Sequence, residues 1–136
     1  MEKLIPASHW LKNTDIRING WGDLTGANGN KSMTVTLTDA AGAPTTETIK
    51  IFPTANYATG KNWDFVIELM HHDAAGVQRC NSISRIGAED TAAETFIYRN
   101  PTLGLDTTTA ITVQVIGTLV SGSDSITQDG LRVMPY

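Results

Sequence analysis

The side chains in this sequence that could perform chemistry are few, and the histidines come first. His71 and His72 are adjacent and are followed by Asp73, while His9 lies far upstream. Neighbouring residues on a strand point to opposite faces, so the two imidazoles could share one metal ion only where the backbone bends. The pattern favours a polar hairpin loop, with a structural metal site or a catalytic group as the alternatives.

The single cysteine is the other potential nucleophile. Cys80 by itself excludes an internal disulfide and any multi-cysteine metal site. It could pair with His71 or His72, but it falls within a predicted strand, and no glycine motif typical of an oxyanion hole surrounds it. Because free cysteine is among the most buried residue types, we interpret Cys80 as a small core residue.

Loops rich in glycine or acidic residues carry weaker signals. Residues 26–32 resemble a phosphate-binding loop superficially, but they lack its spacing and precede a strand, whereas that motif opens a helix. Asp124 and Asp129 fall short of the ligand count of a calcium loop, and a loop calcium ion stays an alternative. We therefore predict no catalytic residue, no metal site and no cofactor. An enzyme on a β-sandwich scaffold is kept as an alternative.

Composition narrows the class of protein. The chain has 136 residues and a formal net charge of -4, a length that suits one domain. The acidic balance argues against a protein held on nucleic acid by phosphate contacts. No apolar run approaches the ~18 residues of a membrane span, and residues 1–6 do not have the basic and apolar pattern of a secretory signal. We expect neither nucleic acid nor a membrane as a partner.

Apolar and polar residues alternate along most of the chain, as in half-buried strands. Residues 62–70 carry the heaviest apolar face, which predicts a central strand and places Trp63 in the core. Pro53 is expected to end the strand before it, because proline cannot donate to a ladder. We predict an all-β protein, an antiparallel β-sandwich of the jelly-roll type with about eight strands and no helix, in a single domain over residues 14–136. The predicted strands cover residues 15–21, 32–38, 46–52, 62–70, 77–86, 95–99, 110–117 and 126–134.

Residues 1–13 are predicted to form an N-terminal arm. Leu4, Ile5, Trp10 and Leu11 are apolar, but Pro6 interrupts them and no helical period is sustained. Such side chains must be buried on their own domain or on a neighbour. For Trp10 we favour docking on a neighbouring chain, with packing under its own sandwich as the alternative.

Trp21 ends the first predicted strand on the same face as Arg17. This position predicts a sheet rim or a subunit contact, since exposed aromatic side chains anchor protein interfaces and stack on sugar rings. The candidate contacts with a subunit or another protein are therefore the four apolar residues of the arm together with this tryptophan: Leu4, Ile5, Trp10, Leu11 and Trp21.

The order of several short motifs resembles small jelly-roll structural proteins of tailed bacteriophages. A strand that ends in Trp-Gly is followed by an Asn-rich turn with a lysine and then by an alternating strand. Later come a strand that begins near a tryptophan, a penultimate strand that ends in glycine, and a last strand. The resemblance covers residues 14–134 and departs from the family pattern at residues 70–73 and 134–136. The segments that carry it are residues 16–22, 26–31, 33–37, 63–70, 111–117 and 124–133.

The resemblance implies a virion structural protein without enzymatic activity. Members of this group are capsid decoration (cement) proteins or distal domains of tail fibres, commonly homotrimers. Because the chain enters its first strand almost immediately, we expect a decoration protein that binds the major capsid protein on the outer surface of the head, after assembly in the host cytoplasm. Deleting residues 2–12 is then expected to abolish capsid binding and leave the fold intact. The alternative is a tail-fibre or baseplate module that recognises carbohydrate, through Trp21, Tyr57 or loop carboxylates.

Overall fold

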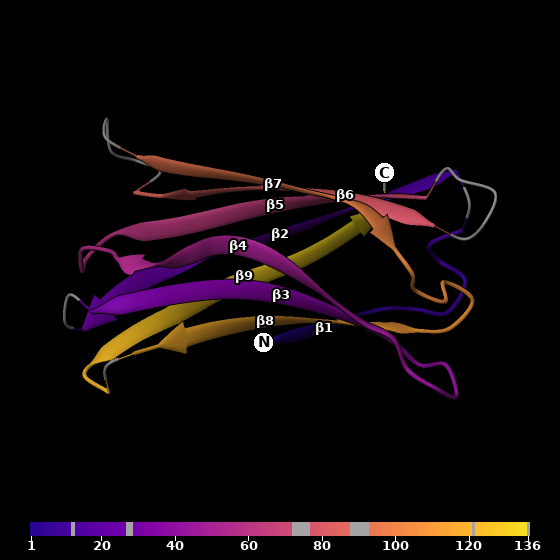
Figure 1. Ribbon diagram of the computed structural model, residues 1–136, viewed down its shortest axis with the longest axis horizontal. Coiled ribbons are helices and arrows are strands. Elements are labelled where there is room, and N and C mark those ends of the chain that lie inside the picture. The colour runs from indigo at the N-terminus through magenta and orange to yellow at the C-terminus, as the bar shows by residue number, and fades with distance from the viewer. Residues whose placement is uncertain (12, 27–28, 72–76, 88–92, 121, 136) are drawn as a thin grey trace.

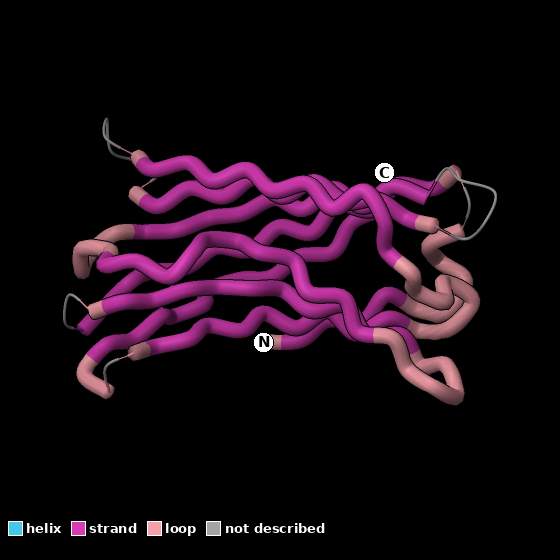
Figure 2. Tube along the Cα trace, viewed as in Figure 1, coloured by secondary structure: helices cyan, strands magenta, loops and turns pink. Residues whose placement is uncertain are grey.

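The computed structural model describes residues 1–11, 13–26, 29–71, 77–87, 93–120 and 122–135. Its described residues form strands and loops, without a helix (Figure 2). None of these residues belongs to a helix that is long and apolar enough to cross a membrane. The strands are β1 (Glu2–Ile5), β2 (Thr14–Gly26), β3 (Asn30–Asp39), β4 (Thr46–Asn56), β5 (Asn62–His71), β6 (Gln78–Ile86), β7 (Glu94–Leu103), β8 (Ile111–Leu119) and β9 (Asp124–Pro135).

The strands build two antiparallel sheets that face each other (Figure 1). One sheet has four strands in the order β1-β8-β3-β4, and the other has five in the order β7-β6-β5-β2-β9. The prediction of an all-β antiparallel sandwich is confirmed, and β5 is a central strand as predicted. The strand beyond the predicted eight is β1, which lies within the segment expected to be an arm. The strand order does not establish a jelly-roll topology, which stays a prediction. β5, β6 and β7 follow one another as a simple meander within one sheet.

The core lies between the two sheets and follows the alternation of the sequence. β3 and β5 alternate strictly between side chains that are buried and side chains that are half exposed over most of their lengths. Each apolar side chain that is fully buried in this layer contributes roughly 1.5–3 kcal/mol. The four-stranded sheet supplies mainly aliphatic residues and the five-stranded sheet adds the aromatic pair Trp63 and Phe65, whose rings stack 6.0 Å apart.

Two glycines on β2 make room for that aromatic pair. A Cβ added to Gly20 would collide with the Phe65 ring, and one added to Gly22 would collide with both the Trp63 ring and the Thr127 backbone. The bulk on β5 is therefore matched by absent side chains on β2. This packing gives a physical reason for glycine at both positions of the Gly-Trp-Gly segment that surrounds Trp21.

One predicted boundary is wrong, and the reason is visible in the pairing. β4 continues through Pro53 to Asn56, whereas we expected Pro53 to end it. Among the described strands β4 pairs with β3 alone, and the register shifts between Lys31 and Met33, opposite this part of β4. A proline is tolerated at an edge strand or a bulge because no ladder partner there requires its missing N–H.

Candidate functional site

The arm predicted from the sequence packs largely on its own domain. β1 pairs with β8, so that Glu2 lies opposite Gln114 and Ile5 opposite Ile111. Ile5 is 2% exposed and Trp10 is 0% exposed, so neither side chain can be a direct contact for another protein. For Trp10 the alternative of packing under its own sandwich is therefore the one observed. Leu4 at 56% and Leu11 at 51% exposure remain accessible.

Trp10 closes one end of the sandwich together with His71. The indole Nε1 donates to the Thr14 carbonyl at 3.0 Å, and the indole ring meets the imidazole edge-on at 5.9 Å. His71 is buried, and its Nδ1 lies 3.4 Å from the Trp10 carbonyl oxygen. Deleting residues 2–12 would remove β1 and these core contacts, so the structure leads us to expect that the deletion destabilises the fold as well.

Those residues of the candidate metal or nucleophilic site that the structure describes form no metal-binding cluster. His71 is enclosed, His9 is exposed, and His72 and Asp73 lie outside the described residues. Within the described ranges, no cluster of three or more histidine, cysteine, aspartate or glutamate side chains could hold a metal ion. Burial raises the pKa of the Cys80 thiol to about 11, so the thiolate is disfavoured at neutral pH.

A buried ion pair that local sequence patterns do not predict lies at one end of β3. The Lys31 ammonium is 3.3 Å from Asp124 Oδ1, and both side chains are fully buried. Lys31 Nζ also donates to the Gly29 carbonyl at 3.0 Å, and the Gly29 N–H donates to Asp124 Oδ1 at 3.1 Å. The pair connects the turn before β3 to the start of β9.

A second buried carboxylate lies at the other end of β3. Asp39 accepts backbone N–H groups from Ala41 at 3.3 Å, Thr45 at 3.0 Å and Asp106 at 2.8 Å. Burial acts to raise the pKa of Asp39, but these three donors outweigh burial and leave the pKa below its ordinary 3.8. Both buried acids therefore have structural partners.

The outer face of the five-stranded sheet carries an apolar row. Val66 on β5, Ile83 on β6 and Ile97 on β7 are direct neighbours in the ladder, and on the other side of Val66 lies Asn19. Ile97 is 60% exposed and Ile83 is 47% exposed. Cross-strand neighbours lie about 5 Å apart, so these side chains form one continuous patch, which we call the Ile97 row.

Ion pairs border the Ile97 row on both sides. Arg85 donates two hydrogen bonds to the Asp64 carboxylate, at 3.1 and 2.8 Å. These bonds, and after them the charge of Asp64, raise the pKa of Arg85. On the other side, Arg17 donates to Glu68 at 3.2 Å. The patch thus combines exposed aliphatic groups with planar guanidinium groups that are already held in place.

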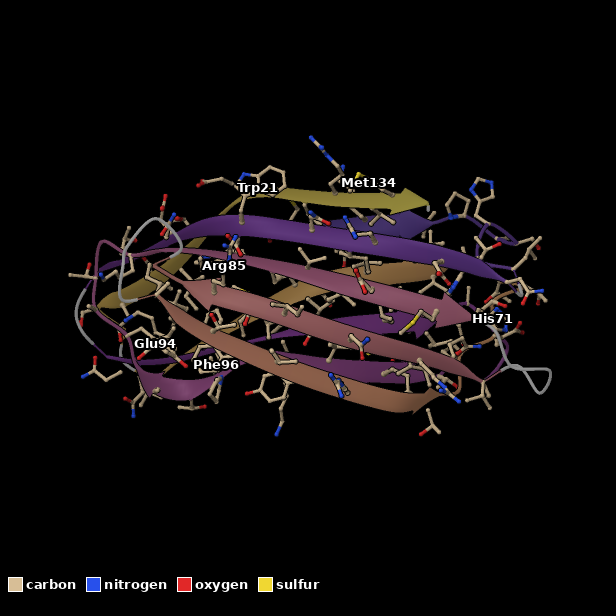
Figure 3. All side chains as sticks on the ribbon, turned by 90° about the horizontal axis from the view of Figure 1, so that it is seen from above. Trp21, His71, Arg85, Glu94, Phe96 and Met134 are labelled. Carbon is tan, nitrogen blue, oxygen red and sulfur yellow. The ribbon has the colours of Figure 1, made fainter. Side chains whose placement is uncertain are left out.

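Trp21 extends this face towards β9. It lies opposite Gly130, and a Cβ added there would collide with the indole ring, so the ring covers the glycine. The side chain remains 40% exposed. Figure 3 shows Trp21 and Met134 on the β9 side of this sheet, while Arg85 lies further across it. Trp21 is not at a sheet rim, because β2 pairs with β5 on one side and with β9 on the other; a subunit contact stays a prediction.

The outer face of the four-stranded sheet has a different character. Its outward positions on β3 and β4 are mostly threonines; Thr36 pairs with Thr48, and Thr38 with Thr46. Threonine is β-branched and suits a solvated sheet surface. This face offers hydroxyl groups but few large apolar anchors.

Comparisons of the chain with models of protein families, with curated protein sequences and with solved structures found no match.

Proposed function

We propose that this chain is a virion structural protein, a phage capsid decoration (cement) protein that binds the major capsid protein on the outer surface of the head as an oligomer. The family resemblance of residues 14–134 supports the phage assignment, the jelly-roll wiring and the homotrimer. The Ile97 row is the observation that carries the binding role. A protein with this role needs an exposed surface whose desolvation costs little free energy, and it needs no reaction centre.

The composition of the Ile97 row and its borders suits a protein partner. Interface hot spots are enriched in tryptophan and arginine and lie in well-packed, desolvated surroundings. Ile83 and Ile97 offer apolar area, while Arg17 and Arg85 are fixed by their carboxylate partners. Guanidinium groups held in this way lose less side-chain entropy when a second surface covers them.

Leu4, Leu11 and Trp21 remain candidate contacts. Trp21 adjoins the five-stranded face, whereas Leu4 belongs to β1 at the edge of the other sheet. An oligomer that used several such patches at once would gain from effective concentration, because the second contact forms within a complex that already exists.

A binding experiment with two matched variants tests this proposal. The gene for the chain is deleted from the phage that encodes it, and heads lacking the protein are isolated. Purified chain is mixed with these heads, and the fraction of the chain that sediments with them is measured. The wild-type chain is expected to bind, and Ile97→Lys is expected to bind about tenfold more weakly, because a lysine in a desolvated contact costs on the order of 1.4 kcal/mol. Thr48→Lys places the same charge on the opposite outer face and should bind like the wild type.

Each outcome addresses a different part of the proposal. If the wild-type chain does not sediment with heads, the capsid assignment is wrong. If Ile97→Lys binds as tightly as the wild type while Thr48→Lys does not, the contact lies on the threonine face. Specific signals on a glycan array, abolished by Trp21→Ala, would instead support the alternative of a tail-fibre or baseplate module that recognises carbohydrate.

A further inference from the structure

The outer edge of β8 is covered for only half of its length. β1 has four residues and lies opposite Ile111–Gln114, whereas β8 runs on to Leu119. Figure 1 shows the N-terminus about midway along β8, and the arrowhead half of β8 without a strand on its outer side. Within the described part of the chain, residues 116–119 pair with β3 alone.

The backbone groups that face this open edge can be identified. Val115 donates its N–H to the Met1 carbonyl at 3.3 Å, so the backbone N–H and C=O of residue 115 are directed towards β1. Val120 donates its N–H to the Asn30 carbonyl at 3.1 Å, so the backbone N–H and C=O of residue 120 are directed towards β3. Because successive residues of a strand alternate in this direction, Gly117 and Leu119 present both N–H and C=O to the open edge.

This edge lacks the features that protect the other edges. β8 contains no charged residue from Ile111 to Leu119, whereas β1, β4, β7 and β9 each carry at least two charged side chains. β4, β7 and β9 also contain a proline. Natural proteins use charge, proline and bulges to keep an edge strand from pairing with another chain. An edge with neither charge nor proline is a template for pairing.

The side chains around the open edge are apolar on both faces of the sheet. Ile116 lies outward, Leu119 is 40% exposed and Val120 is 70% exposed. On the inward face, a groove between β8 and β9 has a mainly apolar lining that also includes one amide: Met1, Met33, Val115, Gly117, Leu119, Ile126 and Gln128. A strand added here would cover these groups as well as the backbone.

We propose that a second copy of this chain pairs with the open edge, so that β8 of one protomer runs antiparallel to β8 of its partner about a two-fold axis at Thr118. In this register Gly117 lies opposite the partner's Leu119, and both residues face the edge, so each pair exchanges N–H and C=O groups. Thr118 lies opposite its own copy. Met1 and β1 stay in place, because the shared ladder begins only beyond Val115.

The lack of charge favours a second copy as the occupant. Two-fold pairing sets the residue on the axis opposite its own copy and the adjacent residues close to theirs, and like charges directly opposite each other are destabilising in a sheet. Residues 111–123 hold no charge, so β8 avoids this penalty in any register, whereas β1, β4, β7 and β9 all carry charged side chains and the last three also carry a proline. The contact joins protomers in pairs, so it is a different contact from the one that would close the homotrimer of the proposed function, and it does not depend on capsid binding.

A cysteine substitution tests the register. Opposed residues of this non-hydrogen-bonded type have Cα atoms about 4.5 Å apart, which falls within the range that a disulfide spans. Thr118→Cys is therefore expected to form a covalent dimer in an oxidised glutathione buffer. Gln114→Cys lies on the same strand and face, but there β1 covers the edge, so it should stay monomeric on a denaturing gel. The wild-type chain is a second control, since Cys80 is buried.

A charge exchange tests the two-fold symmetry independently of oxidation. Thr118→Lys and Thr118→Glu each place like charges opposite each other, so each is expected to weaken the dimer about tenfold in analytical ultracentrifugation. An equimolar mixture of the two variants should regain the dimer, because lysine then faces glutamate. Circular dichroism and thermal unfolding check that each variant keeps the fold.

Three results would overturn the proposal. One is a wild-type chain that sediments as a monomer up to about millimolar concentration, the range of very weak association. Another is a wild-type oligomer whose sedimentation is unchanged in both Thr118→Lys and Thr118→Glu. The third is a Gln114→Cys chain that cross-links as readily as Thr118→Cys.

Discussion

The two ends of β3 each hold a buried carboxylate, but they satisfy it by different means. Asp39 receives three backbone N–H groups from the neighbouring loops. Asp124 receives one backbone N–H and the ammonium group of Lys31, and its Oδ2 accepts no hydrogen bond from the described residues. Backbone donors stabilise the Asp39 carboxylate without a second charged group, whereas the Asp124 carboxylate depends on the ammonium group of one long side chain, Lys31.

This difference indicates at which end of β3 the replacement of a single side chain costs more folding stability. A buried charge that loses its only charged partner is left uncompensated, which costs more than the loss of one hydrogen bond among several. The Lys31 end also connects the turn before β3 to the start of β9, directly after the open part of β8. Stability at that end therefore bears on the edge proposed to pair with a second copy.

Replacing Lys31 is expected to have the largest effect. Lys31→Met should lower the free energy of unfolding by about 3–5 kcal/mol, because it leaves Asp124 buried and charged. Adding Asp124→Asn should recover part of that loss, since the charge is then gone and Oδ1 can still accept from Gly29. Urea unfolding of the single and double variants measures the coupling. Strictly additive effects would show that the ion pair contributes nothing.

Replacing Asp39 is expected to have an intermediate effect, with a characteristic pH dependence. Asp39→Asn turns one acceptor into a donor, which leaves the Asp106 N–H without an acceptor and costs about 1–3 kcal/mol at neutral pH. Because the folded pKa lies below 3.8, the carboxylate stabilises the fold above that pH, and this contribution is lost as the pH falls through the folded pKa. The variant should lose less stability than the wild type between about pH 5 and pH 2. Parallel curves would contradict this account.

Replacing Tyr57 is expected to have the smallest effect and the opposite pH dependence. Its hydroxyl donates to the Pro53 carbonyl at 2.6 Å, and its carbonyl lies 3.5 Å from Lys31 Nζ. Tyr57→Phe should cost about 1 kcal/mol at neutral pH. Burial, and after it the charge of Glu94, raises the pKa of Tyr57 from 10.0 to about 12, so the unfolded chain loses this proton first and stability falls as the pH rises from 10 to 12.

The alkaline test compares unfolding midpoints of the wild type and Tyr57→Phe across that range. The variant should decline less steeply, since it lacks the phenol. Both chains retain Cys80, whose raised pKa of about 11 adds the same slope to each. A wild-type curve that is flat above pH 10, after this common slope is subtracted, would contradict a buried, protonated Tyr57.

Much of the fold could be predicted because alternation is a local property. The inward faces of β3 and β5 were identified from period-two patterns alone, and Trp63 lies in the core as expected. Pro53 misled the prediction because the effect of proline depends on whether its strand is central or at an edge. The sequence near Pro53 does not contain that information.

The candidate site was less predictable, because exposure depends on distant partners. Leu4 and Ile5 are neighbours with similar side chains, yet the pairing of β1 with β8 exposes the first and buries the second. The Ile97 row was missed because its members come from three strands and meet only through register. The sequence signal that could have suggested it is one isoleucine in phase with polar residues on each strand, Ile83 on β6 and Ile97 on β7.

The sequence alone determined the class of the fold, the composition of the core and the absence of charge along β8, because each follows from residue types a few positions apart. Tertiary structure decided which strands became edges, how far β1 covers β8, and that Lys31 meets Asp124. Those outcomes depend on how the two sheets are connected and in which register their strands pair. Backbone hydrogen bonds are alike for every residue, so only the packing of the whole chain selects among the possible pairings.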